Sequence, residues 1–121
     1  MPTNPTHIVI DRSGFLDILQ RNNNKVVFKF GAEWCKPCNR IINTVAECCQ
    51  TLPDDIKVFL IDVDENFDLY AYMKSKKIVQ SIPTLLCYHA GNTTYAPNTL
   101  VVGSDIPQIQ SFFYNVKNAG I

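Results

Sequence analysis

The sequence contains no long apolar run and no excess of charge of one sign. No stretch approaches the roughly 18 consecutive apolar residues that a membrane-spanning helix needs, so we expect no membrane partner. The 11 basic and 11 acidic side chains cancel. A nucleic-acid partner is therefore not expected, because proteins that bind nucleic acids usually carry a clear basic excess.

Residues 1–6 lack the basic cluster and the apolar segment of a signal peptide. The five cysteines make an odd count, and Cys48 and Cys49 are adjacent. The cysteines of a secreted disulfide framework are usually even in number and dispersed. Together these features predict a reducing intracellular compartment and a cytoplasmic location.

Internal repeats, linkers and low-complexity segments are also missing. The chain has 121 residues, of which 46% are hydrophobic and 18% charged. This length and composition are typical of one globular domain with its own hydrophobic core. We therefore predict a single domain over residues 1–121.

The hydrophobic pattern predicts strands and helices in alternation. Strands are expected at residues 7–10, 25–30, 56–63, 85–88 and 99–102. Helices are expected from the capping residues 11–13 to the polar break at 21–24, and at 35–50, 67–76 and 105–117. The nearly continuous apolar run at 56–63 is typical of a strand buried on both faces of a parallel sheet. The order predicts an α/β fold, in which a central mixed sheet of about five strands is flanked by four helices.

Two cysteines, Cys35 and Cys38, are separated by two residues at the expected start of the second helix. The unpaired N–H groups of a helix start, and the positive end of its dipole, would stabilise a thiolate on Cys35. Cys38, one turn further on, could then form a disulfide with it. Pro37 suits the first helical turn, where a missing N–H costs no hydrogen bond. The motif predicts dithiol–disulfide redox chemistry.

A zinc site is the alternative interpretation of a Cys-x-x-Cys motif. Zinc would need two further ligands, and the available soft side chains are His7, Cys48, Cys49, Cys87 and His89. None of them forms a second Cys-x-x-Cys pair. The strand before the motif and the helix after it favour redox chemistry, and we expect no metal.

Three segments resemble the thioredoxin family. Trp-Cys-Lys-Pro-Cys at residues 34–38 resembles the family's Trp-Cys-Gly-Pro-Cys, and Ser-Ile-Pro-Thr at 81–84 resembles its Ile-Pro-Thr segment. Val-Gly at 102–103 resembles the family's Val-Gly near the end of the sheet. The order of elements agrees from about residue 7 to residue 117. The resemblance implies a thioredoxin fold and thiol–disulfide oxidoreductase activity.

The resemblance also implies roles for the residues of the motif. Cys35 would attack the disulfide of a protein substrate, Cys38 would resolve the mixed disulfide, and Trp34 would shield the sulfurs. The Cys35–Cys38 disulfide would be the redox group, with no bound cofactor. A thioredoxin-reductase-like protein or glutathione would return the electrons.

The other two segments are expected to bind substrate. By the resemblance, Pro83 is a cis proline that faces the dithiol, and Ile82 offers backbone hydrogen bonds to an extended substrate segment. Gly103 would complete an apolar rim around the site. With Trp34, these residues form the expected substrate-binding surface.

Two lysines depart from the family pattern. Lys29 occupies the position of a buried Asp that is thought to accept a proton from the second cysteine, and the family's nearby buried Lys is here Leu60. We hypothesise that Lys29 lowers a cysteine pKa and makes the protein more oxidising; alternatively, its long stem carries the charge to solvent. Lys36 replaces the motif's Gly, and its charge should also favour a thiolate. With Pro37 and Pro83, these lysines are the expected redox-tuning residues.

Three other cysteines have no predicted catalytic role. Cys48 and Cys49 lie on the order of 20 Å along a helix from Cys35, too far for a disulfide. Cys49, on an apolar stripe, and Cys87, within a strand, are expected to be buried and inert, and Cys48 to be exposed. Residues 92–98 are expected to form a surface loop.

Three functions are compatible with this sequence. The leading one is the reduction of protein disulfides. A second uses the same residues but runs toward oxidation or isomerisation, as Lys29 and Lys36 could allow. A third is a binding module in which the chemistry is dispensable, although the retained cysteines, tryptophan and proline weigh against a dead site.

Overall fold

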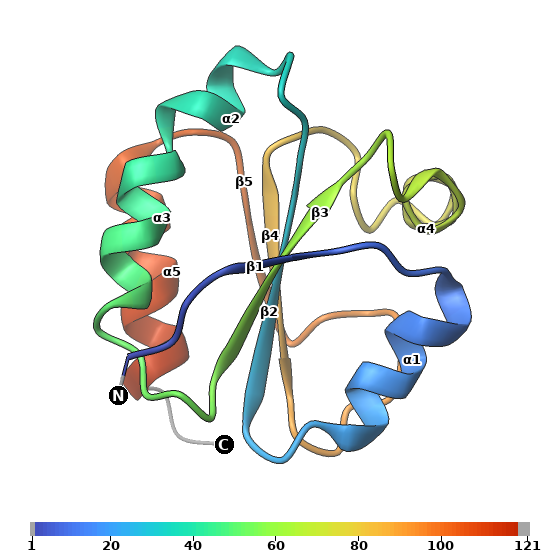
Figure 1. The fold of residues 1–121 in the computed structure, drawn as a ribbon, viewed down its shortest axis with the longest axis horizontal. Helices are drawn as coiled ribbons and strands as arrows, with labels where there is room; N and C mark the ends of the chain where they lie inside the picture. Colours follow the sequence, from blue (N-terminus) through green and yellow to red (C-terminus); the bar gives the residue numbers. More distant parts are fainter. Residues whose placement is uncertain (1, 119–121) are drawn as a thin grey trace.

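The computed structural model describes residues 2–118 (Figure 1). The elements are, in order, β1 (Thr6–Ile8), α1 (Arg12–Arg21), β2 (Lys25–Gly31), α2 (Lys36–Arg40), α3 (Ile42–Cys49), β3 (Lys57–Asp62), α4 (Phe67–Ser75), β4 (Thr84–His89), β5 (Thr99–Val102) and α5 (Ile106–Asn118). The predicted domain over 1–121 also includes residues 1 and 119–121, which lie outside the described residues. Within residues 2–118, no helix is long and apolar enough to span a membrane.

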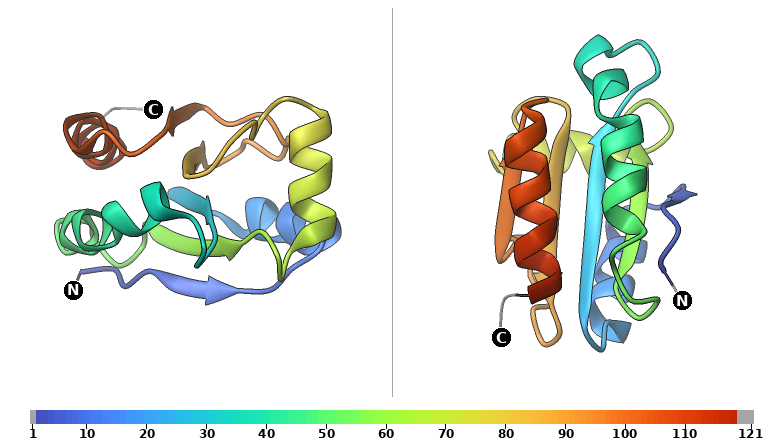
Figure 2. Two further views of the ribbon diagram at one scale, coloured as in Figure 1. Left: turned by 90° about the horizontal axis from the view of Figure 1, so that it is seen from above. Right: turned by 90° about the vertical axis from the view of Figure 1, so that its left-hand side faces the viewer.

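The described strands form one five-stranded sheet in the order β1-β3-β2-β4-β5. β3 runs parallel to both β1 and β2, whereas β4 pairs antiparallel with both β2 and β5. The predicted mixed sheet is therefore confirmed. Helices cover both faces: α3 and α5 lie together on one face, and α1 and α4 lie on the other (Figures 1 and 2).

The central strand β2 separates two hydrophobic cores. Phe28 and Phe30 point into the core beneath α1 and α4, whereas Val27 points into the core beneath α3 and α5. All three side chains are completely buried. This alternation follows from the two-residue period of a β-strand, and it places Lys29 on the face of Val27, opposite the phenylalanines.

The predicted second helix, at residues 35–50, is two helices in the structure. It is interrupted at Ile41, where the backbone has φ −107° and ψ 3°. The Ile41 amide donates to the Cys38 carbonyl, three residues back, instead of continuing the α-helical pattern. Because Ile41 is completely buried, this break occurs where the helix meets the sheet, and α2 is inclined to α3 (Figure 1). The described residues therefore contain five helices rather than the expected four.

Two strands also differ from the predicted pattern. β1 ends at Ile8 rather than at residue 10, because the Ile10 amide donates to the Asn66 side chain and so leaves the sheet. On β3, Phe59 and Leu60 are only half-buried. The prediction that this strand is fully buried on both faces was therefore wrong. Leu60 borders a cavity that the sequence does not reveal.

The predicted surface loop at 92–98 is held by its own side chains. Asn92 donates to the Ala96 carbonyl at 2.9 Å, and its side-chain oxygen accepts from the Thr94 amide at 3.0 Å. The ring of Tyr95 stacks on Phe15, with centroids 5.7 Å apart. The loop is therefore anchored to the core on the α1 and α4 face.

Asn66 is the polar residue that joins the ends of β1 and β3. Only 2% of its surface is exposed. Its side-chain oxygen accepts from the Ile10 amide at 2.7 Å, and its nitrogen donates to the carbonyls of Ile8 and Asp62 at 3.2 and 2.9 Å. The side-chain amide of Asn66 thus satisfies three backbone groups. Those of Ile10 and Ile8 lie 56 and 58 residues away in the sequence, and that of Asp62 lies 4 residues away.

We expect Asn66→Ala to lower the free energy of unfolding by about 2 to 4 kcal/mol, because it leaves several partly buried backbone groups without partners. Urea denaturation followed by circular dichroism measures the change. Asn43→Ala, on the exposed surface of α3, is the control and should change stability by less than about 0.5 kcal/mol. Equal effects of the two substitutions would contradict the role assigned to Asn66.

Candidate active site

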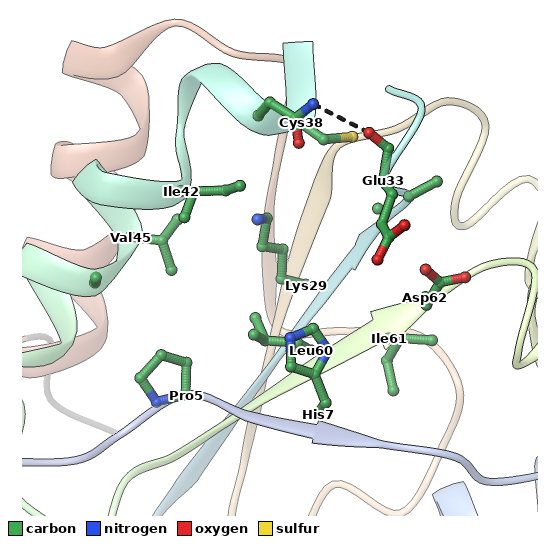
Figure 3. A pocket seen from close by; sticks show the side chains of 14 residues that line it. Pro5, His7, Lys29, Glu33, Cys38, Ile42, Val45, Leu60, Ile61 and Asp62 are labelled. Atoms are coloured by element: carbon green, nitrogen blue, oxygen red, sulfur yellow. Dashed lines mark hydrogen bonds between the residues drawn. The ribbon is translucent and has the colours of Figure 1, made fainter. Parts of the chain in front are cut away.

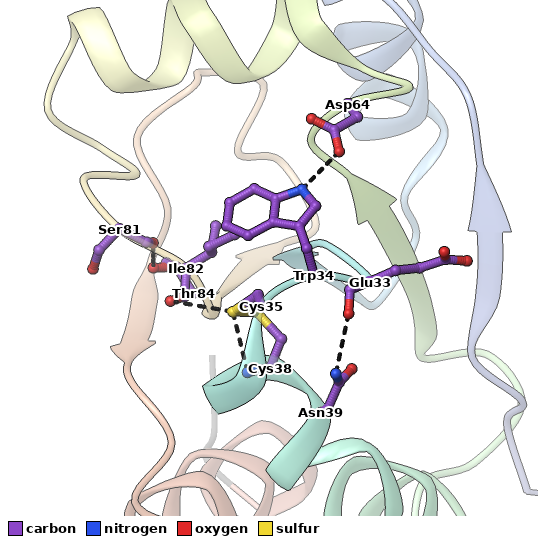
Figure 4. The surroundings of a disulfide bond; sticks show 9 residues. All are labelled: Glu33, Trp34, Cys35, Cys38, Asn39, Asp64, Ser81, Ile82 and Thr84. Atoms are coloured by element: carbon purple, nitrogen blue, oxygen red, sulfur yellow. Dashed lines mark hydrogen bonds between the residues drawn. A yellow bond between two sulfur atoms is a disulfide. The ribbon is translucent and has the colours of Figure 1, made fainter.

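Cys35 and Cys38 are joined by a disulfide between the end of β2 and the first turn of α2 (Figure 4). Their Cα atoms are 5.2 Å apart, within the usual range for a disulfide. Both residues are buried, with 5% and 3% of their surfaces exposed. The predicted pair is therefore brought together.

The sulfur of Cys35 caps the start of α2. It accepts a hydrogen bond from the Cys38 amide at 3.2 Å, and Pro37 lies in the first turn of the helix. In the reduced protein, such an N–H stabilises a negative charge on the sulfur. Because α2 has only five residues, we attribute this stabilisation to the amide itself rather than to a long helix dipole.

The loop before β4 approaches the disulfide from the opposite side. The Ile82–Pro83 peptide bond is cis, as expected, and the carbonyl oxygen of Ile82 lies 3.8 Å from the sulfur of Cys35. The Gly103 amide donates to the Pro83 carbonyl at 2.9 Å. Gly103 has φ +96°, a conformation that residues with a side chain rarely adopt. The structure thus gathers the three predicted segments around one disulfide.

Trp34 is fixed by a residue that the sequence analysis missed. Its indole Nε1 donates to the carboxylate of Asp64 at 2.8 Å (Figure 4), while 67% of the tryptophan surface remains exposed. Asp64 follows β3 as Trp34 follows β2, and the ends of parallel neighbouring strands lie at one edge of the sheet. The place of Asp64 just after the strand at residues 57–62 is the sequence feature from which its contact with Trp34 could have been predicted.

A cavity of about 210 Å³ lies behind the disulfide (Figure 3). Its walls include Cys38 from α2, Lys29 from β2, and Leu60 from β3. Lys29 and Leu60 are direct neighbours across the two parallel strands. Lys29 is half-buried, and loss of hydration lowers the pKa of its amine. Lys36, at the first position of α2, is exposed.

The other cysteines are distinguished by burial. Cys49 and Cys87 are buried, as predicted, and burial raises the pKa of their thiols to about 12 and about 11. Cys48 is half-buried rather than exposed, and burial, together with the neighbouring Glu47, raises its pKa. None of the three is in a position that favours a thiolate.

The alternative of a zinc site gains no support from the geometry. The two sulfurs of the motif are bonded to each other. In the part of the chain that the structure describes, no group of three or more His, Cys, Asp or Glu side chains could hold a metal ion.

We expect iodoacetamide at pH 7 to modify Cys35 first in the reduced protein, because its sulfur accepts the Cys38 amide. Cys49 and Cys87 should remain unmodified up to pH 8. Their pKa values of about 12 and about 11 lie above that pH, so both thiols stay protonated. Mass spectrometry of peptides gives the order. Unfolding in urea is the control and should expose all five cysteines; modification of Cys38 before Cys35 would contradict the assignment.

Comparisons with known proteins agree with this geometry. The family model described as Thioredoxin matches residues 6–113. The thioredoxin of Rickettsia bellii is 31% identical over 83 residues, which make up 69% of this chain and 74% of that protein. Thioredoxin Y2, a chloroplastic protein of Arabidopsis thaliana, is 30% identical over 79 residues, or 65% of this chain but only 45% of that protein. The structure of Trichomonas vaginalis thioredoxin superposes with a TM-score of 0.74 at 22% identity, covering 93% of this chain and 96% of that one.

Proposed function

The chain belongs to the thioredoxin family, and from this premise we propose that it reduces disulfide bonds in partner proteins. The observation that carries the proposal is the Cys35–Cys38 disulfide, with the sulfur of Cys35 at the start of α2. This arrangement lets one sulfur act as a nucleophile while the other stays within bonding distance.

The proposed reaction has two exchange steps. The thiolate of Cys35 attacks one sulfur of the substrate disulfide, which forms a mixed disulfide and releases the other substrate sulfur as a thiolate. Cys38 then attacks the sulfur of Cys35 and releases the second substrate thiol. Two electrons pass from the dithiol to the substrate, and Cys35 and Cys38 are left joined as the structure shows them.

The substrate is proposed to lie across the three segments around the disulfide. Trp34 and Val102 are exposed apolar residues, with 67% and 47% of their surfaces accessible. Ile82, Pro83 and Gly103 supply backbone at the rim. An extended peptide can pair with such backbone with little demand on its sequence, while the indole of Trp34 shields the mixed disulfide from solvent.

The proposed electron donor is a thioredoxin-reductase-like protein or glutathione, which reduces Cys35–Cys38 after each cycle. The chain would then serve in electron transport and redox homeostasis of a reducing compartment. We propose the cytoplasm as that compartment, because the pattern of five cysteines is unlike a secreted framework. Arabidopsis thioredoxin Y2 is described as chloroplastic, which makes an organelle the principal alternative.

Two other functions are not favoured. An oxidant or isomerase would need a reduction potential of about −180 to −120 mV, whereas a reductase is expected near about −270 mV. A measured potential near the lower value supports the proposal. A binding module would not need the bonded, capped cysteine pair that the structure contains.

The clearest test is to stop the reaction at the mixed disulfide. We expect the reduced Cys38→Ser variant to form a stable mixed disulfide with disulfide-bonded proteins such as insulin, because the resolving thiol is gone. Non-reducing electrophoresis detects the complex. Cys48→Ser is the matched control, since it removes a half-buried thiol outside the site and should leave turnover unchanged.

Cys35→Ser should abolish both turnover and the covalent complex. A complex that persists in Cys35→Ser would show that another cysteine is the nucleophile. Full biological activity of a Cys35→Ser/Cys38→Ser double variant would instead favour the binding module.

A further inference from the structure

Lys29 and Cys38 share one face of β2 and one cavity. Residues 29 and 31 point to the same side of the strand because side chains alternate. On that side Gly31 lies directly beneath Cys38: a methyl group added to Gly31 would be 3.4 Å from the Cys38 sulfur. Lys29, two residues earlier, extends into the cavity that Cys38 borders, and in Figure 3 its amine points toward the helix that carries Cys38.

The surroundings of Lys29 are mainly apolar. Ile42, Val45 and Leu60 border the same cavity. Among the residues that the structure describes, none forms a hydrogen bond or an ion pair with the Lys29 amine. An ammonium in such a place loses hydration without compensation, and the pKa of Lys29 is lowered accordingly. Burial therefore disfavours the ammonium form of Lys29 relative to that of an exposed lysine.

Four other titratable groups face the cavity or Lys29. His7 comes from β1 and Glu33 from the loop after β2, and both are exposed to solvent. Oδ1 of Asp62, at the end of β3, accepts hydrogen bonds from the Asp64 and Glu65 amides at 2.8 and 3.2 Å.

Cys49, from α3, is the remaining group. An ionised Cys49 would raise the pKa of Lys29. Its own pKa of about 12 keeps it a neutral thiol. It therefore supplies no charge near neutral pH, and Cys38 is the sulfur through which Lys29 can act.

We propose that Lys29 accepts the proton of the Cys38 thiol during the second exchange step. This inference rests on the proposed function, because it assigns a proton acceptor to the resolving step of that reaction. Lys29 is a positioning residue in this role: it acts through Cys38 and does not touch the substrate.

The step balances in atoms and electrons. The thiol proton of Cys38 passes to the neutral amine of Lys29, which becomes an ammonium. The Cys38 thiolate attacks the sulfur of Cys35 and forms the Cys35–Cys38 bond, while the bond between Cys35 and the substrate sulfur breaks. The released substrate thiolate takes a proton from water, and Lys29 returns its proton to solvent through the cavity.

The chromogenic disulfide dithiobis(nitrobenzoate) separates the two steps. Attack by Cys35 releases one coloured thiolate at a rate that rises with reagent concentration. Resolution by Cys38 releases the second at a rate that does not. Stopped-flow absorbance of the reduced protein therefore measures both, and a Cys35→Ser/Cys38→Ser variant corrects for colour released by the other cysteines.

At pH 7 we expect Lys29→Met to slow the second release at least tenfold and the first by less than twofold, since a general base typically contributes about 10²-fold or more. In this variant the second rate should rise about tenfold per pH unit, because only spontaneously formed thiolate reacts. Lys117→Met, which removes an exposed lysine from the last turn of α5, is the control and should leave the second release unchanged. Cys49→Ala should also leave it unchanged.

Chemical rescue distinguishes proton transfer from a structural role. Lys29→Ala leaves space in the cavity, so added methylamine should accelerate its second release in proportion to the concentration of the free amine. An unchanged second release in Lys29→Met overturns the inference, as does equal slowing of both releases or a lack of rescue. Failure of the first release in the unmodified protein would instead overturn the proposed function, so the two failures are distinguishable.

Discussion

The site depends on the pairing of β2 with β3 on one side and β4 on the other. The parallel pairing brings the carboxyl ends of β2 and β3 to one edge, where Trp34 meets Asp64. The antiparallel pairing brings the amino end of β4 to the same edge, and with it the cis peptide bond before Pro83. A disulfide placed after β2 therefore meets groups from two neighbouring strands. Were β4 parallel, Pro83 would lie at the opposite end of the sheet.

The side chains of β2 lie in two different environments, one on each face of the strand. One face carries aromatic rings into a closed core, where Phe28 packs against Phe15 with centroids 4.5 Å apart. The other face carries two lysines. The amine of Lys25, which is buried, donates to the Val116 carbonyl at the end of α5 at 2.7 Å. Lys29, four residues on, instead borders the cavity behind Cys38. Two identical residue types on one face thus have different chemical roles because different elements cover them.

Much of the local structure was predictable. The hydrophobic pattern identified the strand at residues 25–30, and the polar residues at 11–13 marked a helix start, which the structure confirms with Asp11 as the capping residue. The Cys-x-x-Cys spacing and Pro37 identified the start of α2. These features depend on residues within one or two turns of each other, so propensity and periodicity describe them well.

Other features were not predictable because they depend on contacts between distant segments. The break at Ile41 and the early end of β1 follow from packing and from the Asn66 side chain, which no local pattern encodes. By itself the sequence determined the element order, the two faces of β2 and the cysteine pair with its capping amide, since each is a matter of spacing along the chain. Only the tertiary structure decided that Asp64 holds Trp34 and that Lys29 opens onto Cys38 rather than into a closed core. The physical reason is that hydration and hydrogen-bond partners of a side chain depend on which distant elements cover it.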